Sequence, residues 1–294
     1  MTVLKMHADE VHTDDALVRR LLTTQLPEWA SLPIARVASS GTDNALYRLG
    51  DDMVVRLPRI HWAVAGLERE LEWLPQLAPH LPQGIPTPLA TGSPADEYPW
   101  PWAVYQWLAG DNPRIGHVDD PESLATDLAN LLLAFRRVEL PGPASGRGVP
   151  LSQRDEPVRA ALAELDGEID VAEATSAWET ALRAPQWPGA PMWLHGDLLP
   201  GNLLLRDGRL IGVLDFGTAG MGDPACDLIA GWGVLPVQPR DVFRAELEVD
   251  DETWARGRGW ALSIALIALP YYKATNPDLA GTARHLITEV LADL

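Results

Sequence analysis

The first third of the chain is built from short apolar runs that alternate with turns. Between residues 34 and 57 apolar and polar positions alternate, and polar residues interrupt the pattern at 39–44 and 50–52, as expected for antiparallel strands. Two flanking segments instead have apolar positions three or four residues apart, which predicts helices. The predicted elements are a helix over 14–26 with Thr13 or Asp14 as its N-cap, three strands within 34–57, a helix over 65–77 and a strand over 102–107.

Beyond about residue 110 the pattern becomes mainly helical. One exception is a pair of apolar runs, 203–205 and 210–214, which flank a polar, glycine-containing turn and predict a β-hairpin. A β-rich part followed by an α-rich part predicts an α+β fold with two lobes, residues 1–107 and 108–294. The predicted helices cover 121–138, 156–182, 251–276 and 278–294.

Composition limits the classes of function. The chain has 294 residues, of which 47% are hydrophobic, and this is enough to bury a sizeable core. The formal net charge is −18, which disfavours a nucleic-acid partner because phosphate backbones need clustered cations. The acidity is compatible with a cationic small-molecule partner, and equally with a role in solubility alone.

The single cysteine and the hydropathy pattern indicate the compartment. Cys226 alone excludes an internal disulfide and a thiolate zinc cluster. No run of about 18 apolar residues predicts a membrane span. The first eleven residues lack the apolar stretch of a secretory signal. We therefore expect a cytoplasmic enzyme without a membrane partner; the oligomeric state is left open.

The most informative chemistry lies around the predicted hairpin. Asp197 precedes it, Asn202 begins it and Asp215 follows it, so the hairpin is expected to bring Asn202 and Asp215 together. Carboxylate and amide oxygens suit Mg²⁺, which is held by few protein ligands plus substrate phosphates. Asp197 is then placed to accept a proton from a hydroxyl. One base and two metal ligands are the groups that phosphoryl transfer needs.

These residues carry a family resemblance. The segment from His195 to Asn202 reads H-G-D-x-x-x-x-N, and Asp215 opens a D-F-G. Together with the segment from Gly222 to Asp227, this resembles the aminoglycoside phosphotransferase family, whose fold is that of the protein kinases. The resemblance extends from about Gly41 to Leu235. It implies an antiparallel sheet with one helix in the first lobe and a mostly helical second lobe.

The resemblance also implies a nucleotide site. A loop over the phosphates is expected at Ser40, Gly41 and Thr42, and a hinge that binds the base at Gln106 and Trp107. ATP is the first expectation for the co-substrate and GTP the alternative, because no residue decides between them.

Two further residues have structural roles by the same resemblance. His195 is expected to bind backbone near the D-F-G, with an acid–base role as the alternative, and Asp227 to support the catalytic loop from below.

The third strand departs from the kinase pattern, because it carries Arg56 where a lysine is expected. A guanidinium can bind phosphate oxygens bidentately, although its geometry differs from that of lysine. Arg59 or another cation are alternatives. Glu70, at the edge of the apolar face of the following helix, is expected to pair with Arg56, whereas Glu68 and Glu72 are expected in solvent.

The predicted function is Mg²⁺-dependent transfer of the terminal phosphoryl group of a nucleoside triphosphate to a hydroxyl of a small molecule, such as an aminoglycoside-like antibiotic. A metabolic kinase for a sugar or amino alcohol is one alternative, and a catalytically weak nucleotide-binding protein is another. The conspicuous residues of the last third could contact an acceptor, although the spacing of Trp260 and its neighbours also fits a helix core. These residues are Trp254, Arg256, Arg258, Trp260, Tyr271, Tyr272 and Asp278, with Asp223 and Glu252 as candidates for meeting ammonium groups.

Overall fold

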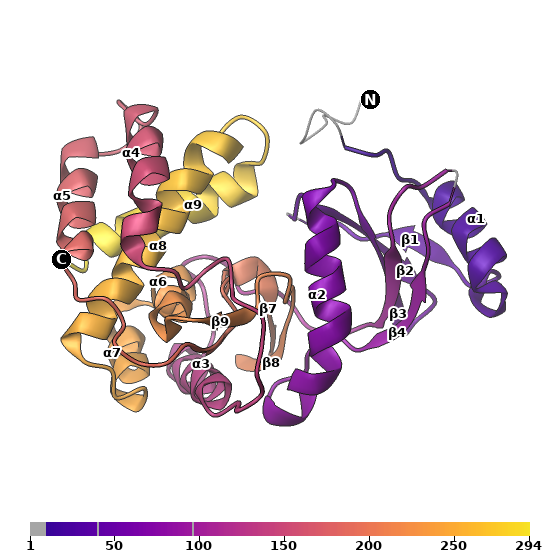
Figure 1. Cartoon of the computed structure of the whole chain (residues 1–294), viewed down its shortest axis with the longest axis horizontal. Coiled ribbons are helices and arrows are strands. Elements are labelled where there is room, and N and C mark those ends of the chain that lie inside the picture. Colours follow the sequence, from indigo (N-terminus) through magenta and orange to yellow (C-terminus); the bar gives the residue numbers. More distant parts are fainter. Residues whose placement is uncertain (1–9, 40, 96) are drawn as a thin grey trace. The chain divides into compact units, whose positions relative to one another are not determined.

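The computed structural model describes residues 10–39, 41–95 and 97–294. It divides into two compact units that alternate along the chain. The first comprises Met1–Pro79, Gly84–Ala109 and Val213–Gly217. The second comprises His80–Gln83, Gly110–Gly212 and Thr218–Leu294. The short segment with the D-F-G therefore belongs to the first unit, while the chain on both sides of it belongs to the second. Figure 1 shows the elements of each unit.

A five-stranded antiparallel sheet forms the first unit, with strand order β1-β2-β3-β5-β4. Gly50, at φ +58°, allows the tight turn between β2 and β3. The four strands expected from sequence are present. β4 was not expected, because its first residue is a proline in a proline-rich stretch. The strands are β1 (Ile34–Arg36), β2 (Asn44–Leu49), β3 (Met53–Pro58), β4 (Pro88–Gly92) and β5 (Trp102–Gln106).

Two helices pack with this sheet. In α1 (Asp15–Gln25) the side chain of Asp14 accepts the N–H of Leu17 and caps the first turn, as expected. In α2 (Trp62–Leu77) the buried residues recur every three or four positions, as the apolar pattern predicts. The short 3₁₀ turns η1 (Pro27–Trp29) and η2 (Ala78–His80) follow the two helices. α1 contributes three leucines and a valine to the core under the sheet, where they meet aromatic and aliphatic side chains of β2, β3 and β5.

The second unit is mainly helical. Acidic residues or Asn cap four of its helices by accepting the backbone N–H three residues on, which accounts for part of the acidic composition. The helical stretch expected over 156–182 is two helices, and α7 was not expected. The helices of the second unit are α3 (Pro121–Arg136), α4 (Asp155–Ala163), α5 (Val171–Leu182), α6 (Ile229–Val234), α7 (Val237–Glu246), α8 (Asp251–Tyr272) and α9 (Pro277–Leu291). The same unit has the 3₁₀ turns η3 (Leu151–Arg154), η4 (Pro200–Asn202) and η5 (Pro224–Leu228).

Two small hairpin-like pairs hold the catalytic segment. β7 (Leu203–Arg206) and β8 (Arg209–Val213) form the expected hairpin, whose turn uses left-handed conformations at its two central residues. β6 (Met192–Leu194) pairs with β9 (Gly220–Gly222). The segment from His195 to Asn202 therefore runs between two anchored strands. None of the described helices is long and apolar enough to cross a membrane.

Candidate active site

The backbone of the loop that carries Asp197 is hydrogen-bonded to one buried carboxylate. Asp227, in η5, accepts the N–H of His195 on Oδ2 and the N–H of Gly196 on Oδ1, both at 2.7 Å. Burial raises the pKa of Asp227, while His195 and the two N–H donors act in the opposite direction. The carboxylate thus fixes the backbone immediately before Asp197.

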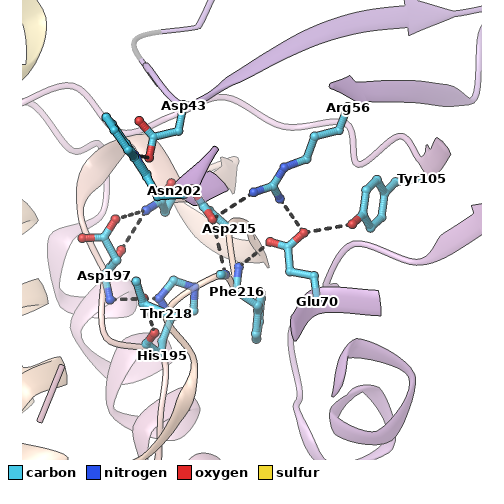
Figure 2. Close-up of polar contacts among 12 residues, drawn as sticks. Asp43, Arg56, Glu70, Tyr105, His195, Asp197, Asn202, Asp215, Phe216 and Thr218 are labelled. Carbon is cyan, nitrogen blue, oxygen red and sulfur yellow. Dashed lines mark hydrogen bonds and ion pairs between the residues drawn. The ribbon is translucent and has the colours of Figure 1, made fainter. Parts of the chain in front are cut away.

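His195 is fully buried and links the same loop to the chain after the D-F-G. Its Nδ1 accepts the N–H of Asp197 at 3.2 Å, and its carbonyl accepts the hydroxyl of Thr218 at 2.9 Å (Figure 2). An imidazole in this position orients the backbone of Asp197. These contacts favour the structural role over an acid–base role, and that assignment stays a prediction.

Asp197 and Asn202 lie together at the end of this loop. The Asn202 amide donates to the Asp197 carbonyl at 2.8 Å and to its carboxylate Oδ2 at 2.9 Å (Figure 2). The Asp197 side chain keeps 25% of its surface exposed, so a hydroxyl can reach it. Because the amide nitrogen of Asn202 is committed to Asp197, its amide oxygen is the atom left for a metal ion.

In the first unit, Arg56 projects from β3 into a cluster of acidic side chains. Nη1 pairs with Glu70 Oε2, and Nη2 lies 3.4 Å from Asp215 Oδ1 (Figure 2). Burial by itself lowers the pKa of Arg56, but Glu70 and Asp215 outweigh it and raise that pKa overall. Arg56 is therefore a buried, permanently charged group beside the D-F-G, with Nε lacking a hydrogen-bond partner among the described residues.

Glu70 connects three parts of the first unit. It has no exposed surface. Besides Arg56, it accepts the hydroxyl of Tyr105 at 3.0 Å and the backbone N–H of Phe216 at 2.8 Å (Figure 2). Burial raises the pKa of Glu70, while Arg56 and the hydrogen bond from Tyr105 oppose that shift. Asp215 itself adopts a left-handed φ of +60°, and its side chain is half exposed.

The alternatives to Arg56 and Glu70 have other surroundings. Arg59 is buried in an ion pair with Glu10 at 2.6 Å, so its guanidinium already has a carboxylate partner. Glu68 and Glu72 are exposed on α2, as the helical pattern predicts. The structure thus forms the Arg56–Glu70 pair that was expected, and the role of this pair toward a nucleotide remains a prediction.

Hydrogen bonds fix the end of the expected phosphate loop. Ser40 lies outside the described residues. The Gly41 N–H donates to Ser39 Oγ at 3.0 Å, and the Thr42 hydroxyl donates to Asp43 Oδ1 at 2.9 Å. Asp43 in turn accepts the Arg59 N–H at 2.7 Å on its carbonyl. Contact of this loop with phosphates stays a prediction.

The expected hinge has both of its named backbone donors engaged. The N–H of Gln106 donates to the Thr87 carbonyl at 2.9 Å, and that of Trp107 donates to the Asp52 carbonyl at 2.7 Å. The Trp107 ring is covered by the guanidinium of Arg48, 4.2 Å from its centre. A base held in this segment would need other groups, such as the exposed Gln106 side chain.

Fewer than half of the conspicuous residues of the last third are buried. Trp254 and Trp260 are buried. Arg256 binds Asp223 through Nε and Oδ2 at 2.7 Å, and Asp223 also accepts the Ala225 N–H, so Asp223 is not available to an ammonium group. Tyr271, in contrast, is half exposed.

Arg147 was missed by the sequence analysis. Its Nη2 lies 4.0 Å from Asp197 Oδ1. The residue belongs to a proline- and glycine-rich loop about fifty positions earlier, and no periodicity or spacing in the sequence connects it with Asp197. Tyr105 was also missed, since a tyrosine within an apolar strand is ordinarily a core residue.

Residues 34–260 match the model of the phosphotransferase enzyme family. The chain belongs to this family. The resemblance inferred from the catalytic motif is thereby confirmed.

One curated relative is similar over about half of the chain. An uncharacterised protein of Bacillus subtilis (strain 168), YcbJ, is 27% identical over 157 residues. That match covers 51% of this chain and 49% of the relative, so the chain spans about half the length of this curated protein.

Solved structures of the family share the fold. The GDP and kanamycin complex of APH(2")-IIIa has a TM-score of 0.74 at 19% identity, covering 95% of this chain and 99% of the other. Macrolide 2'-phosphotransferase MphH from Brachybacterium faecium has a TM-score of 0.59 at 24% identity, covering 91% and 96%. These likenesses confirm the expected α+β, protein-kinase-like fold.

The residue types present suit the magnesium ion that the phosphotransferase family implies. Among the described residues there is no group of three or more His, Cys, Asp or Glu side chains that could hold a metal. Mg²⁺ needs no such group, because it takes one or two protein oxygens and completes its shell with water and phosphates. The Asp215 carboxylate and the Asn202 amide oxygen are hard donors of the right kind.

Proposed function

We propose that this protein is a Mg²⁺-dependent O-phosphotransferase that moves the terminal phosphoryl group of a nucleoside triphosphate to a hydroxyl of a small molecule. One observation carries the proposal: Asp197 is accessible and hydrogen-bonded to Asn202, on a loop whose backbone is fixed by Asp227. A module that only binds a nucleotide has no need of a positioned base.

Asp197 is the general base of this reaction. The acceptor oxygen attacks the terminal phosphorus, and its proton passes to the Asp197 carboxylate. The bond between that phosphorus and the bridging oxygen breaks, and its electron pair stays on the nucleoside diphosphate. Asn202, through its hydrogen bond to Oδ2, holds the carboxylate in one orientation.

Arg56 binds the non-transferred phosphates of the nucleotide. Its charge and fork of N–H donors suit phosphate oxygens, and Glu70 fixes the direction of the guanidinium. Asn202 and Asp215 would hold Mg²⁺, which supplies neutralisation of the phosphate charge when it is bound. In this proposal residues 1–107 bind the nucleotide, with Ser40, Gly41 and Thr42 at the phosphates and Gln106 and Trp107 near the base. Residues 108–294 bind the acceptor.

The acceptor is proposed to be an antibiotic-like compound with hydroxyl groups. A structural relative was solved with kanamycin, and another is named as a macrolide phosphotransferase. The net charge of −18 favours a cationic acceptor by long-range attraction. We place the enzyme in the cytoplasm, where nucleoside triphosphates are available.

The test is a panel assay with purified protein. Consumption of ATP and of GTP is followed with Mg²⁺ and aminoglycosides, macrolides, sugars and amino alcohols, and phosphorylated products are identified by mass spectrometry. Asp197→Asn is run in parallel as the matched control. The proposal expects acceptor-dependent consumption in the wild type and loss of it in the variant. Equal turnover by both proteins would contradict the proposal. Products on metabolic alcohols alone would instead assign a metabolic kinase.

A further inference from the structure

A cation stands next to the proposed base. The guanidinium of Arg147 lies 4.0 Å from Asp197 Oδ1, the carboxylate oxygen that Asn202 does not occupy. The two side chains keep 27% and 25% of their surface exposed, so both are open to a small molecule. Among the described residues this is the only charged partner of the guanidinium, which donates no hydrogen bond there.

The backbone of Arg147 is fixed against the catalytic loop. Its N–H donates to Ser145 Oγ at 3.0 Å, and that hydroxyl donates to the Thr218 carbonyl at 2.8 Å. The Ser145 N–H donates to the carbonyl of Met221, in the strand β9, at 3.0 Å. Through Thr218 this arrangement reaches His195, whose carbonyl accepts the Thr218 hydroxyl. Arg147 and the loop of the base are therefore both connected by hydrogen bonds to Thr218.

Gly196 makes room for the stem of Arg147. A Cβ atom at Gly196 would lie 3.1 Å from Cβ and 3.2 Å from Cγ of Arg147, and 3.0 Å from the Thr218 hydroxyl. These distances are shorter than the ordinary van der Waals contacts of a Cβ atom. The residue also has φ +85°, a conformation that favours glycine. The glycine directly before the base thus permits the arginine to cross the loop.

The 4.0 Å between the Arg147 guanidinium and Asp197 Oδ1 allows one reacting oxygen to contact both groups. A hydroxyl that gives its proton to Asp197 must come within about 2.6–3.2 Å of the carboxylate. An oxygen at that distance can also lie within hydrogen-bond reach of a guanidinium 4.0 Å from the carboxylate. The transferred phosphorus bonds to this same oxygen, so its other oxygens lie within reach of the remaining N–H donors.

We propose that Arg147 is a further catalytic residue, which binds the oxygens of the phosphoryl group while it is being transferred. This inference rests on the proposed function. Charge builds up on those oxygens and on the bridge to the leaving group during transfer, and an arginine supplied from the same chain stabilises it. Asp197 takes the proton of the acceptor hydroxyl, and Arg147 binds the phosphoryl group that takes the place of this proton on the acceptor oxygen.

The test compares Arg147→Gln, Arg147→Lys and the control Arg159→Gln on an acceptor that the wild type phosphorylates. Arg159 is a half-exposed arginine of α4 in the same unit. We expect Arg147→Gln to lower kcat about 10²- to 10³-fold with little change in KM for nucleotide or acceptor, the usual loss for one donor to a developing charge. Arg147→Lys, which keeps the stem on Gly196, should recover at least about tenfold of that loss, since it restores the charge without the fork. Arg159→Gln should match the wild type.

A second measurement avoids turnover. Calorimetry follows binding of nucleoside diphosphate and Mg²⁺ with and without aluminium fluoride, which imitates the phosphoryl group in transfer. The wild type should bind more tightly with the fluoride, and Arg147→Gln should lose this increment while its binding of the diphosphate alone is unchanged. Wild-type kcat in Arg147→Gln, a loss confined to acceptor KM, or an unchanged fluoride increment overturns the inference while leaving Asp197 as the base. Absence of transfer by the wild type itself would remove the proposed function and this inference together.

Discussion

Glu70 accepts the backbone N–H of Phe216 at 2.8 Å, although 146 residues separate the two along the chain. The same buried carboxylate pairs with Arg56 and accepts the hydroxyl of Tyr105. One charge therefore holds the helix α2, two strands of the sheet and the residue after Asp215. Stability of the first unit and binding of the nucleotide are expected to depend on it together.

Removal of Glu70 should be costly. Glu70→Ala leaves Arg56 buried with only the more distant Asp215, and breaking a buried ion pair costs about 3–5 kcal/mol. Urea unfolding followed by circular dichroism measures the change. Glu68→Ala is the matched control, since Glu68 lies exposed on the same helix and should change the unfolding free energy by less than about 0.5 kcal/mol. Similar small losses in both variants would show that the pair contributes little.

Arg56→Ala should raise the KM for nucleotide and lower kcat. A hydrogen bond to a charged group is worth about 1.5–3 kcal/mol, so kcat/KM should fall roughly 10- to 150-fold. Arg56→Lys should restore part of the activity, and the double variant with Glu70→Ala should be less than additive, because the partners share one interaction. Steady-state kinetics with varied nucleotide gives these values.

Arg59→Ala separates the two candidate cations, Arg56 within β3 and Arg59 directly after it. It should leave the nucleotide KM unchanged, because Arg59 is already paired with Glu10. If instead Arg59→Ala raises that KM and Arg56→Ala does not, the phosphate-binding cation has been assigned to the wrong arginine.

Gly196→Ala should destabilise the protein more than Gly167→Ala. Both glycines have φ near +80°, so alanine strains the backbone by about 1–3 kcal/mol at each. At Gly167 the new Cβ meets nothing within 4 Å, whereas at Gly196 it meets Arg147 and Thr218. Overpacking adds about 1–3 kcal/mol there. Chemical denaturation of the two variants gives the difference in their free energies of unfolding. Equal losses would show that the Arg147 side chain can move away from the new Cβ without cost.

Asp227 should give the protein a distinct pH dependence. Burial raises the pKa of Asp227 in the folded state above its value in the unfolded chain, about 3.9. Its contribution to stability is then fully present below the unfolded pKa and is lost as pH rises through the folded pKa. Relative to Asp227→Asn, the wild type should lose unfolding free energy as pH rises from about 4. Parallel stability curves for the two proteins would contradict this expectation.

Residues whose environment follows from local periodicity could be predicted from the sequence. Glu70 lies on the buried face of α2 because its spacing from Leu67 and Leu74 places it there, and Glu68 falls outside that face for the same reason. The hairpin after Asn202 followed from two apolar runs and a polar turn. The sequence limited the N-cap of α1 to Thr13 or Asp14, and the structure shows Asp14.

Features that depend on tertiary packing could not be predicted. β4 begins with a proline and joins the sheet only through its pairing with β5. Arg147 reaches Asp197 because its loop pairs with β9, a contact between segments far apart in sequence. Trp254 and Arg256 have the residue types of a ligand site, yet packing of α8 buries both. Both side chains stand out in the sequence because they belong to the packed interior of the second unit.

The central claim is that Asp197 takes the proton of the acceptor hydroxyl. The most direct test measures, for the wild type and Asp197→Asn, both kcat for transfer to an accepted alcohol and the Kd for the nucleotide with Mg²⁺. The account predicts that kcat falls by about 10²–10⁴ while the nucleotide Kd stays within about twofold, because a positioned acid–base group contributes that much to the rate and little to ground-state binding. Wild-type kcat in Asp197→Asn, or a loss of rate explained by weaker nucleotide binding alone, would contradict the account.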